Sequence, residues 1–127
     1  MRNTLNTILL SCLLALSCAA MAGPQSQGDK EINYLLEFVA TSDCTFVRNG
    51  DRYNGADAAD HLRGKYNGDK RHVHNGEQFI SRVASKSSTT GMPYMVNCED
   101  SEPETTDQWL HKALAIYLNH SDPYRDR

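Results

Sequence analysis

Three side chains in the middle of the sequence could together bind an anion. His61 and Lys65 are four residues apart, so a helix would place them on one face, one turn after Asp57. If this face meets the side of a β-hairpin that carries Arg48, the three side chains form a cationic pocket that fits a carboxylate or a phosphate. A structural explanation fits the same residues, with Asp57 pairing with His61 and Arg48 pairing with Asp51 across a turn. Both interpretations stay open at this point.

A hydroxyl-rich run, Ser87-Ser88-Thr89-Thr90, offers a nucleophile for which His61 would be the base. The run lies in neither a Gly-x-Ser-x-Gly nor a Ser-x-x-Lys motif, because Lys86 directly precedes Ser87. Capping of a helix end and hydrogen bonds within a loop explain such hydroxyls without catalysis. A small envelope hydrolase using His61, Arg48 and residues 87–90 is therefore the alternative, and we assign no catalytic residue.

Two further histidines, His72 and His74, would lie on one side of an extended segment near Glu77. Copper or zinc needs more ligands than these, and the sequence shows no obvious ones. We therefore expect no metal and no cofactor. Tyr94 and Trp109 are more typical of core aromatic residues than of a platform for sugars. The candidate ligand-binding residues are Arg48, Asn49, His61, Lys65, Ser88 and Tyr94.

Periodicity and turn residues predict the elements that would hold these side chains. Apolar residues at i, i+3, i+4 and i+7 from Ile32 to Val39 indicate a helix that begins near Lys30. The dipeptide Asn49-Gly50 is typical of a type I′ turn, and its hairpin would pair Phe46 with Tyr53. Arg48 would then lie on the same sheet face as these two rings.

Three capping patterns, at Asn54, Asn75 and Thr105, predict three more helices. Alternation over residues 92–98 indicates a short strand, and five acidic residues between Glu99 and Asp107 indicate a solvated loop. The predicted fold class is therefore α+β: a small antiparallel sheet, made of a β-hairpin and one further strand, packed with about four helices.

The first 22 residues are typical of a secretory signal peptide, since a basic Arg2 and an uncharged apolar run precede Ala20-Met21-Ala22. Cleavage would leave Gly23 first and the protein in the periplasm. Lipid modification of Cys18 is a minor alternative, because Ala15 is a poor match to the leucine-like residue that such a site needs three places upstream. After the signal peptide we expect a flexible leader at 23–29, one domain at 30–119 and a frayed tail at 120–127.

The charge balance excludes some classes of partner. Removing residues 1–22 from the 127 leaves 105, with 12 basic and 16 acidic side chains and a net charge of −4. This balance disfavours a nucleic-acid binder, and no second long apolar run follows that could span a membrane. We expect a non-enzymatic binding module whose partner is an envelope protein or an anionic envelope polymer.

Cys44 and Cys98 are the two cysteines that remain after signal cleavage. Two thiols in an exported domain are more often paired than free, and no Cys-x-x-Cys spacing indicates a metal or redox site. We therefore predict a disulfide that closes a loop of 54 residues.

Three stretches of the sequence resemble a known family. They are Ser42–Gly50 (SDCTFVRNG), Ala58–Tyr66 (AADHLRGKY) and Phe79–Tyr94, and the pair Trp109-Leu110 fits as well. They are similar to motifs of the YfeK-like family of small exported bacterial proteins, known as domain of unknown function 5329. The resemblance runs from about Glu31 to Leu118. It implies a periplasmic α+β domain and carries over no catalytic residues.

Overall fold

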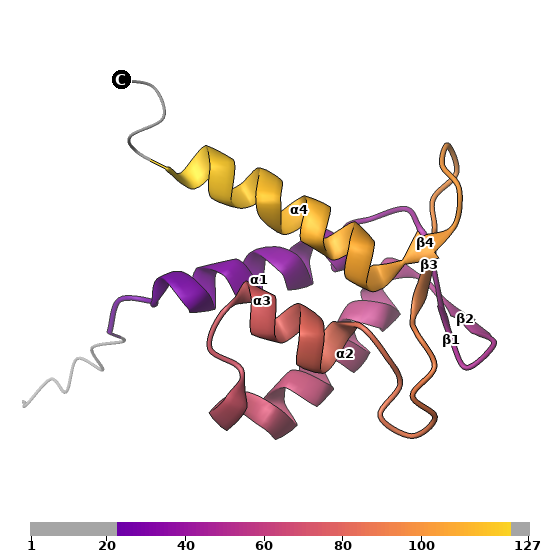
Figure 1. Ribbon diagram of the computed structural model, residues 1–127, viewed down its shortest axis with the longest axis horizontal. Coiled ribbons are helices and arrows are strands. Elements are labelled where there is room, and N and C mark those ends of the chain that lie inside the picture. The colour runs from indigo at the N-terminus through magenta and orange to yellow at the C-terminus, as the bar shows by residue number, and fades with distance from the viewer. Residues whose placement is uncertain (1–22, 123–127) are drawn as a thin grey trace, which may run out of the picture.

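The computed structural model, which describes residues 23–122, follows the order helix, β-hairpin, helices, two strands and a last helix (Figure 1). The predicted signal peptide, including Cys18, lies outside the described residues. In chain order the elements are α1 (Gln27–Ala40), β1 (Thr45–Arg48), β2 (Asp51–Tyr53), α2 (Gly55–Asp69), a 3-10 turn (Lys70–His72), α3 (Gly76–Phe79), a π-helical turn (Ile80–Ala84), β3 (Met95–Asn97), β4 (Glu104–Thr105) and α4 (Thr106–Ser121). The predicted α+β class is confirmed.

The strands form one antiparallel sheet in the order β2-β1-β3-β4, at one end of the helical part of the molecule (Figure 1). The hairpin pairs Phe46 with Tyr53, as predicted. Both turn residues have the positive φ that a type I′ turn requires, 51° at Asn49 and 84° at Gly50. This turn is what lets Arg48, the last residue of β1, lie over the hairpin's inner face.

The sheet has one strand more than the sequence predicts. Glu104 and Thr105 form β4, which pairs with Val96 and Met95, although the sequence indicates only a solvated acidic loop there. A strand of two residues is too short to show the alternation by which strands are recognised. Its position is set by the helix that follows, because Thr105 also caps α4 by accepting a hydrogen bond from the Gln108 amide.

Two helix ends differ from the predicted boundaries. α1 begins at Gln27, inside the predicted leader, because the Ser26 hydroxyl accepts from the Asp29 amide and the Asp29 carboxylate accepts from the Ser26 amide. At the other end, α4 continues to Ser121 and so enters the predicted tail. The rest of that tail, residues 123–127, lies outside the described part of the chain.

The third predicted helix forms as a single α-helical turn that widens into a π-helical turn. Asn75 caps it as predicted, and Phe79, Ile80, Val83 and Ala84 are buried on its inner side. The Ser85 hydroxyl donates to the Ile80 carbonyl five residues earlier, which matches the π-helical spacing.

The core lies between the helices and the inner face of the sheet. The predicted stripe of α1, from Ile32 to Val39, is buried there. Cys44 and Cys98 form the predicted disulfide, with their Cα atoms 4.4 Å apart. They flank β1 and β3, whose register pairs Thr45 with Asn97. The helices of residues 23–122 include none with the length and apolar character that crossing a membrane requires.

Candidate functional site

Arg48 reaches from the end of β1 to His61 on α2. Its Nη1 lies 2.8 Å from each ring nitrogen of His61, and its Nη2 donates to the Tyr53 hydroxyl at 3.5 Å. A guanidinium can only donate hydrogen bonds, so this contact needs an unprotonated nitrogen on the imidazole. Asp51 pairs with Arg48 in strand register, yet the predicted ion pair across the turn does not form: the Asp51 side chain is exposed and Arg48 turns inward instead.

Lys65 lies one turn after His61 on α2 and meets the segment that leads into β3. Its Nζ donates to the Tyr94 hydroxyl at 3.1 Å and to the Lys86 carbonyl at 2.9 Å. The Tyr94 hydroxyl is also 3.3 Å from Nε2 of His61. The structure thus brings together four of the predicted ligand-binding residues. We call Arg48, His61 and Lys65 the cation cluster, and Tyr94 joins two of its members.

The partners of the cation cluster are electrically neutral. Across residues 23–122, the hydrogen bonds of Arg48 and Lys65 go to imidazole, hydroxyl and carbonyl groups, and neither forms an ion pair with a carboxylate. Burial, then the charges of Arg48 and Lys65, lower the pKa of His61 below its ordinary value. Burial and the charge of Arg48 likewise lower the pKa of Lys65. The cluster is therefore a region of uncompensated positive charge.

Arg48 also has a hydrogen-bond donor to spare. Its Nε is buried and has no hydrogen-bond partner among the described residues. Leaving a buried donor unpaired costs about 1–3 kcal/mol, so such groups are uncommon in folded proteins. An acceptor from a ligand would remove this cost.

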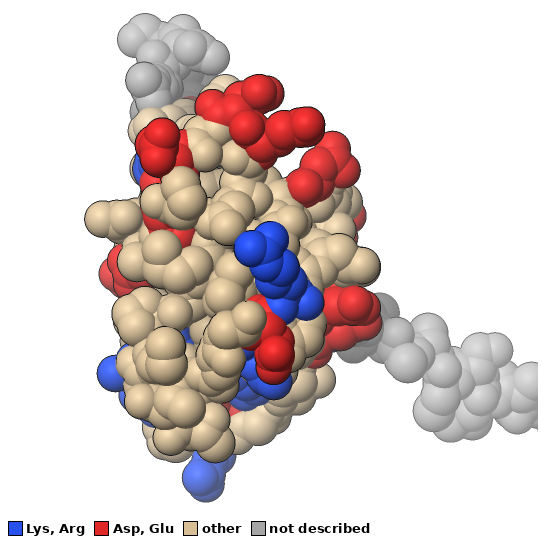
Figure 2. Space-filling model, turned by 90° about the vertical axis from the view of Figure 1, so that its right-hand side faces the viewer, with Lys and Arg blue, Asp and Glu red and all other residues tan. Residues whose placement is uncertain are grey.

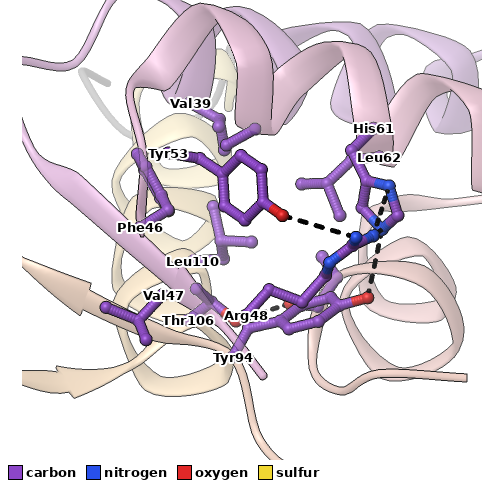
Figure 3. A pocket seen from close by; sticks show the side chains of 12 residues that line it. Val39, Phe46, Val47, Arg48, Tyr53, His61, Leu62, Tyr94, Thr106 and Leu110 are labelled. Carbon is purple, nitrogen blue, oxygen red and sulfur yellow. Dashed lines mark hydrogen bonds between the residues drawn. The ribbon is translucent and has the colours of Figure 1, made fainter. Parts of the chain in front are cut away.

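A cavity of about 70 Å³ lies beside the guanidinium of Arg48. Figure 3 shows Arg48 reaching across to His61, with the Tyr53 hydroxyl directed at the guanidinium. Two further polar side chains line it: the Tyr94 hydroxyl accepts from Lys65, and the Thr106 hydroxyl donates to the Ala84 carbonyl. Apolar side chains form most of the wall: Val39, Phe46, Ala58, Leu62, Ala84 and Leu110.

Asn49 and Ser88 are not part of the cation cluster. The Asn49 amide donates to the Ser87 hydroxyl at 3.1 Å and its carbonyl accepts from the Thr90 hydroxyl, so that the hairpin turn is tied to the loop of residues 87–91. The buried hydroxyl of this loop is that of Ser87, which is 4% exposed. Ser88 is exposed, and none of the hydrogen bonds within residues 23–122 involves its side chain.

Tyr53 and the Lys86 carbonyl belong to the site and were not among the predicted ligand-binding residues. The sequence carried a signal for Tyr53, since the hairpin register places it on the face of Arg48. Lys86 carried none, because it takes part through its backbone oxygen, which any residue type could supply.

Comparison with known proteins decides the family of this chain. A profile described as "Family of unknown function (DUF5329)" matches residues 26–118. The chain belongs to the DUF5329 family. It is 43% identical over 82 residues to the uncharacterized protein YfeK of Salmonella typhimurium, an alignment that covers 64% of this chain and 68% of that relative. No solved structure matches.

In the described part of this DUF5329 domain, the Ser87 hydroxyl and the His61 ring, which the hydrolase alternative requires as nucleophile and base, do not form a hydrogen bond with each other. The Ser87 hydroxyl bonds to Asn49 and lies 3.0 Å from the Thr89 hydroxyl. The His61 ring bonds to Arg48 and Tyr94 instead. A nucleophile needs its base within hydrogen-bond reach, and a base that accepts from arginine has its lone pair occupied. The geometry therefore places no histidine base beside the Ser87 hydroxyl in the described residues.

The histidines considered as metal ligands take other partners in this DUF5329 domain. His72 lies 2.7 Å from the Asp69 carboxylate, which also accepts from Arg82. The backbone amide of His74 donates to Gln78. No group of three or more potential metal-ligating side chains occurs in the described part of the chain.

Proposed function

We propose that this protein is an exported, non-enzymatic binding domain whose cation cluster captures the carboxylate or phosphate of an anionic cell-envelope component. The observation that carries the proposal is that Arg48 and Lys65 share a partly buried site in which their hydrogen bonds go only to neutral groups. Like charges in one site repel each other, and an anion is the group that would relieve this.

The atoms available for contact support a planar anion in particular. Arg48 combines a buried unpaired Nε with a guanidinium fork that matches the two oxygens of a carboxylate or phosphate. Lys65 adds a second positive charge, and the Tyr94 hydroxyl contacts both its Nζ and the Nε2 atom of His61. The Tyr53 and Tyr94 hydroxyls supply further donors.

Export is supported by the sequence and by the disulfide. Residues 1–22 have the charge and apolar pattern of a signal peptide. A disulfide between Cys44 and Cys98 is more typical of an oxidising compartment than of the cytosol. Sequencing the N-terminus of the protein from a periplasmic extract tests this part of the proposal. Gly23 is the expected first residue, and a lipid-modified Cys18 would contradict a soluble form.

The binding proposal is tested by titrating the purified, oxidised protein with acetate and with inorganic phosphate by calorimetry. We expect saturable binding with Kd on the order of 1 mM, the strength that a few charge-assisted hydrogen bonds give to a small anion. Arg48→Gln and Lys65→Gln each remove one charge and should weaken binding at least tenfold. The two anions distinguish a carboxylate site from a phosphate site.

A matched control comes from the same helix. Arg63 lies on α2 between His61 and Lys65 but is exposed and pairs with Asp60 at 2.8 Å, so Arg63→Gln should leave binding unchanged. It removes the same charge from the molecule as a whole. Equal loss in all three variants would show a net-charge effect, and wild-type affinity in Arg48→Gln would overturn the proposal.

A further inference from the structure

The cavity beside Arg48 has mostly apolar walls, and most of its polar lining groups belong to Arg48 and its neighbours Tyr53, His61 and Tyr94. Seven of its twelve lining residues are apolar, and the Thr106 hydroxyl among the others already donates to the Ala84 carbonyl. A water molecule needs two to four polar partners to stay in a cavity, so an apolar occupant fits the part lined by Val39, Phe46 and Leu110 better than water does. In Figure 3 the guanidinium and His61 lie to one side of Tyr53, whereas Val39, Phe46 and Leu110 lie to the other.

Charge and cavity together define an amphipathic ligand. We infer that the anion held by the cation cluster is a carboxylate joined to a short aliphatic chain, and that this chain fills the cavity below Arg48. The inference rests on the proposed function, because the cation cluster supplies the anchor for the carboxylate. It adds the part of the ligand that gives selectivity, since the apolar part of the pocket rejects a second charge or a hydroxyl.

The volume of the cavity sets the length of the chain. An apolar cavity of about 150 Å³ in another protein accommodates benzene, with six carbons. A cavity of about 70 Å³ is a little under half that size and fits two to four carbons. Each methylene that leaves water tightens binding about fourfold. The affinity should therefore change measurably with each carbon added to the chain.

The test is a titration of the oxidised wild-type protein with acetate, propionate, butyrate, valerate and hexanoate at constant pH and ionic strength. We expect the affinity to rise about fourfold per added methylene and to level off once the cavity is full. Equal affinities from acetate to butyrate would overturn the inference. A rise that continues through hexanoate without levelling off would place the chain outside the cavity and would overturn it as well.

A pair of variants locates the chain. Ala58 lines the cavity, and Ala58→Val narrows it, so the increase in affinity from acetate to butyrate should become flat. Ala56→Val makes the same change two residues away, at an exposed position of α2, and should keep the wild-type increase. If Ala58→Val keeps it too, the chain binds elsewhere. Should Ala58→Val fail to fold, the wild-type series still decides.

The series of acids tests the aliphatic chain separately from the anion site on which it rests. If acetate binds and Arg48→Gln weakens it while chain length has no effect, the anion site stands and the apolar chain is wrong. If none of the acids binds to the wild-type protein but inorganic phosphate does, the inference is wrong and the anion site stands; if phosphate does not bind either, both are wrong. N-acetylvaline distinguishes two sources of the same chemistry: binding tighter than that of butyrate assigns the carboxylate to a peptide C-terminus, and weaker binding assigns it to a free acid.

Discussion

Arg48 is the residue on which the site depends. It lines the cavity, its Cζ lies 5.4 Å from the centre of the Tyr53 ring, and its Nη1 contacts the His61 ring, which must be neutral to accept. Each of these contacts could be made by the protein alone, yet none neutralises the charge. A residue kept only for stability would be expected to have a carboxylate partner at this depth, because isolated buried charges are costly.

His61 should make the stability of the protein depend on pH. Its pKa is lowered in the fold by burial, with Arg48 and Lys65 adding to the effect, whereas in the unfolded chain it is about 6.5. As the pH falls through 6.5 toward the lowered pKa, the unfolded chain takes up a proton that the folded protein resists. The folded state is therefore destabilised on acidification over this window.

The expected result is that His61→Gln loses less free energy of unfolding than the wild type between pH 7 and pH 5. Urea unfolding at several pH values measures the difference. His111 acts in the opposite direction, because Glu77 raises its pKa, but it is present in both proteins and cancels. Parallel pH curves for the two proteins would contradict the neutral His61 that the contact with Arg48 requires.

For single residues, the sequence predicts which side chains share a face of an element better than it predicts which side chains touch one another. The spacing of His61 and Lys65 placed them on one face of α2, and the hairpin register placed Arg48 on the inner face of the sheet. That the two faces meet was an assumption, since it depends on how α2 packs. Ser88 was predicted to bind a ligand, but the buried hydroxyl is that of its neighbour Ser87. Four successive hydroxyl residues give no pattern that distinguishes a buried position from an exposed one.

Helix α2 is the element that positions the cation cluster, and its first residue packs closely against α1. A Cβ atom at Gly55 would lie 2.4 Å from the Val39 carbonyl oxygen and 2.8 Å from that of Ser42. Both are backbone atoms, which cannot move aside as a flexible side chain can. The absence of a side chain at Gly55 therefore sets the distance between α2 and the end of α1.

Two glycine substitutions on α2 should act in opposite directions. Gly55→Ala forces the helices apart and should lower the free energy of unfolding by about 1–3 kcal/mol, the usual cost of overpacking. Gly64→Ala adds a methyl group in open space in the middle of the same helix, and it should raise stability by about 1 kcal/mol. Urea denaturation of both variants gives the comparison. Equal effects would mean that the close approach at Gly55 does not limit packing.

The elements with strong local signals were predicted, and those set by tertiary contacts were not. Capping residues and turn chemistry identified the hairpin and the starts of α2 and α4. β4 and the π-helical turn are different in kind. β4 depends on its pairing with Val96 and Met95 of β3. In the π-helical turn, the Ile80 carbonyl accepts from the Ser85 hydroxyl and the Ala84 carbonyl accepts from the Thr106 hydroxyl.

Over the whole molecule, a small net charge conceals an uneven distribution. The chain has 13 basic and 16 acidic residues, for a net charge of −3. On the face shown in Figure 2, acidic side chains gather at the upper end, whereas the basic ones lie at mid-height and below, with further acidic side chains beside them. An anion would be repelled by the first region and drawn toward the second.

The disulfide should contribute a large part of the total stability. Cys44 and Cys98 are 54 residues apart, and cross-linking a loop of that length stabilises a protein by up to about 4 kcal/mol through the lost entropy of the unfolded chain. Small domains have only about 5–15 kcal/mol in all. We expect urea unfolding of the Cys44→Ser/Cys98→Ser protein to give a midpoint well below that of the oxidised wild type. Coincident curves would contradict the cross-link.

Strand β3 pairs with β1 at positions fifty residues apart in the chain, Phe46 with Val96. Closing so long a loop costs more entropy than closing the hairpin, so β1, β2 and α2 are able to form before β3 arrives. Tyr94, which leads into β3, brings the hydroxyl that joins His61 to Lys65. The order of assembly follows from this topology: we expect the cation cluster to be completed only after β3 has joined β1, so that a nascent chain lacks the Tyr94 contact until this loop of fifty residues has closed.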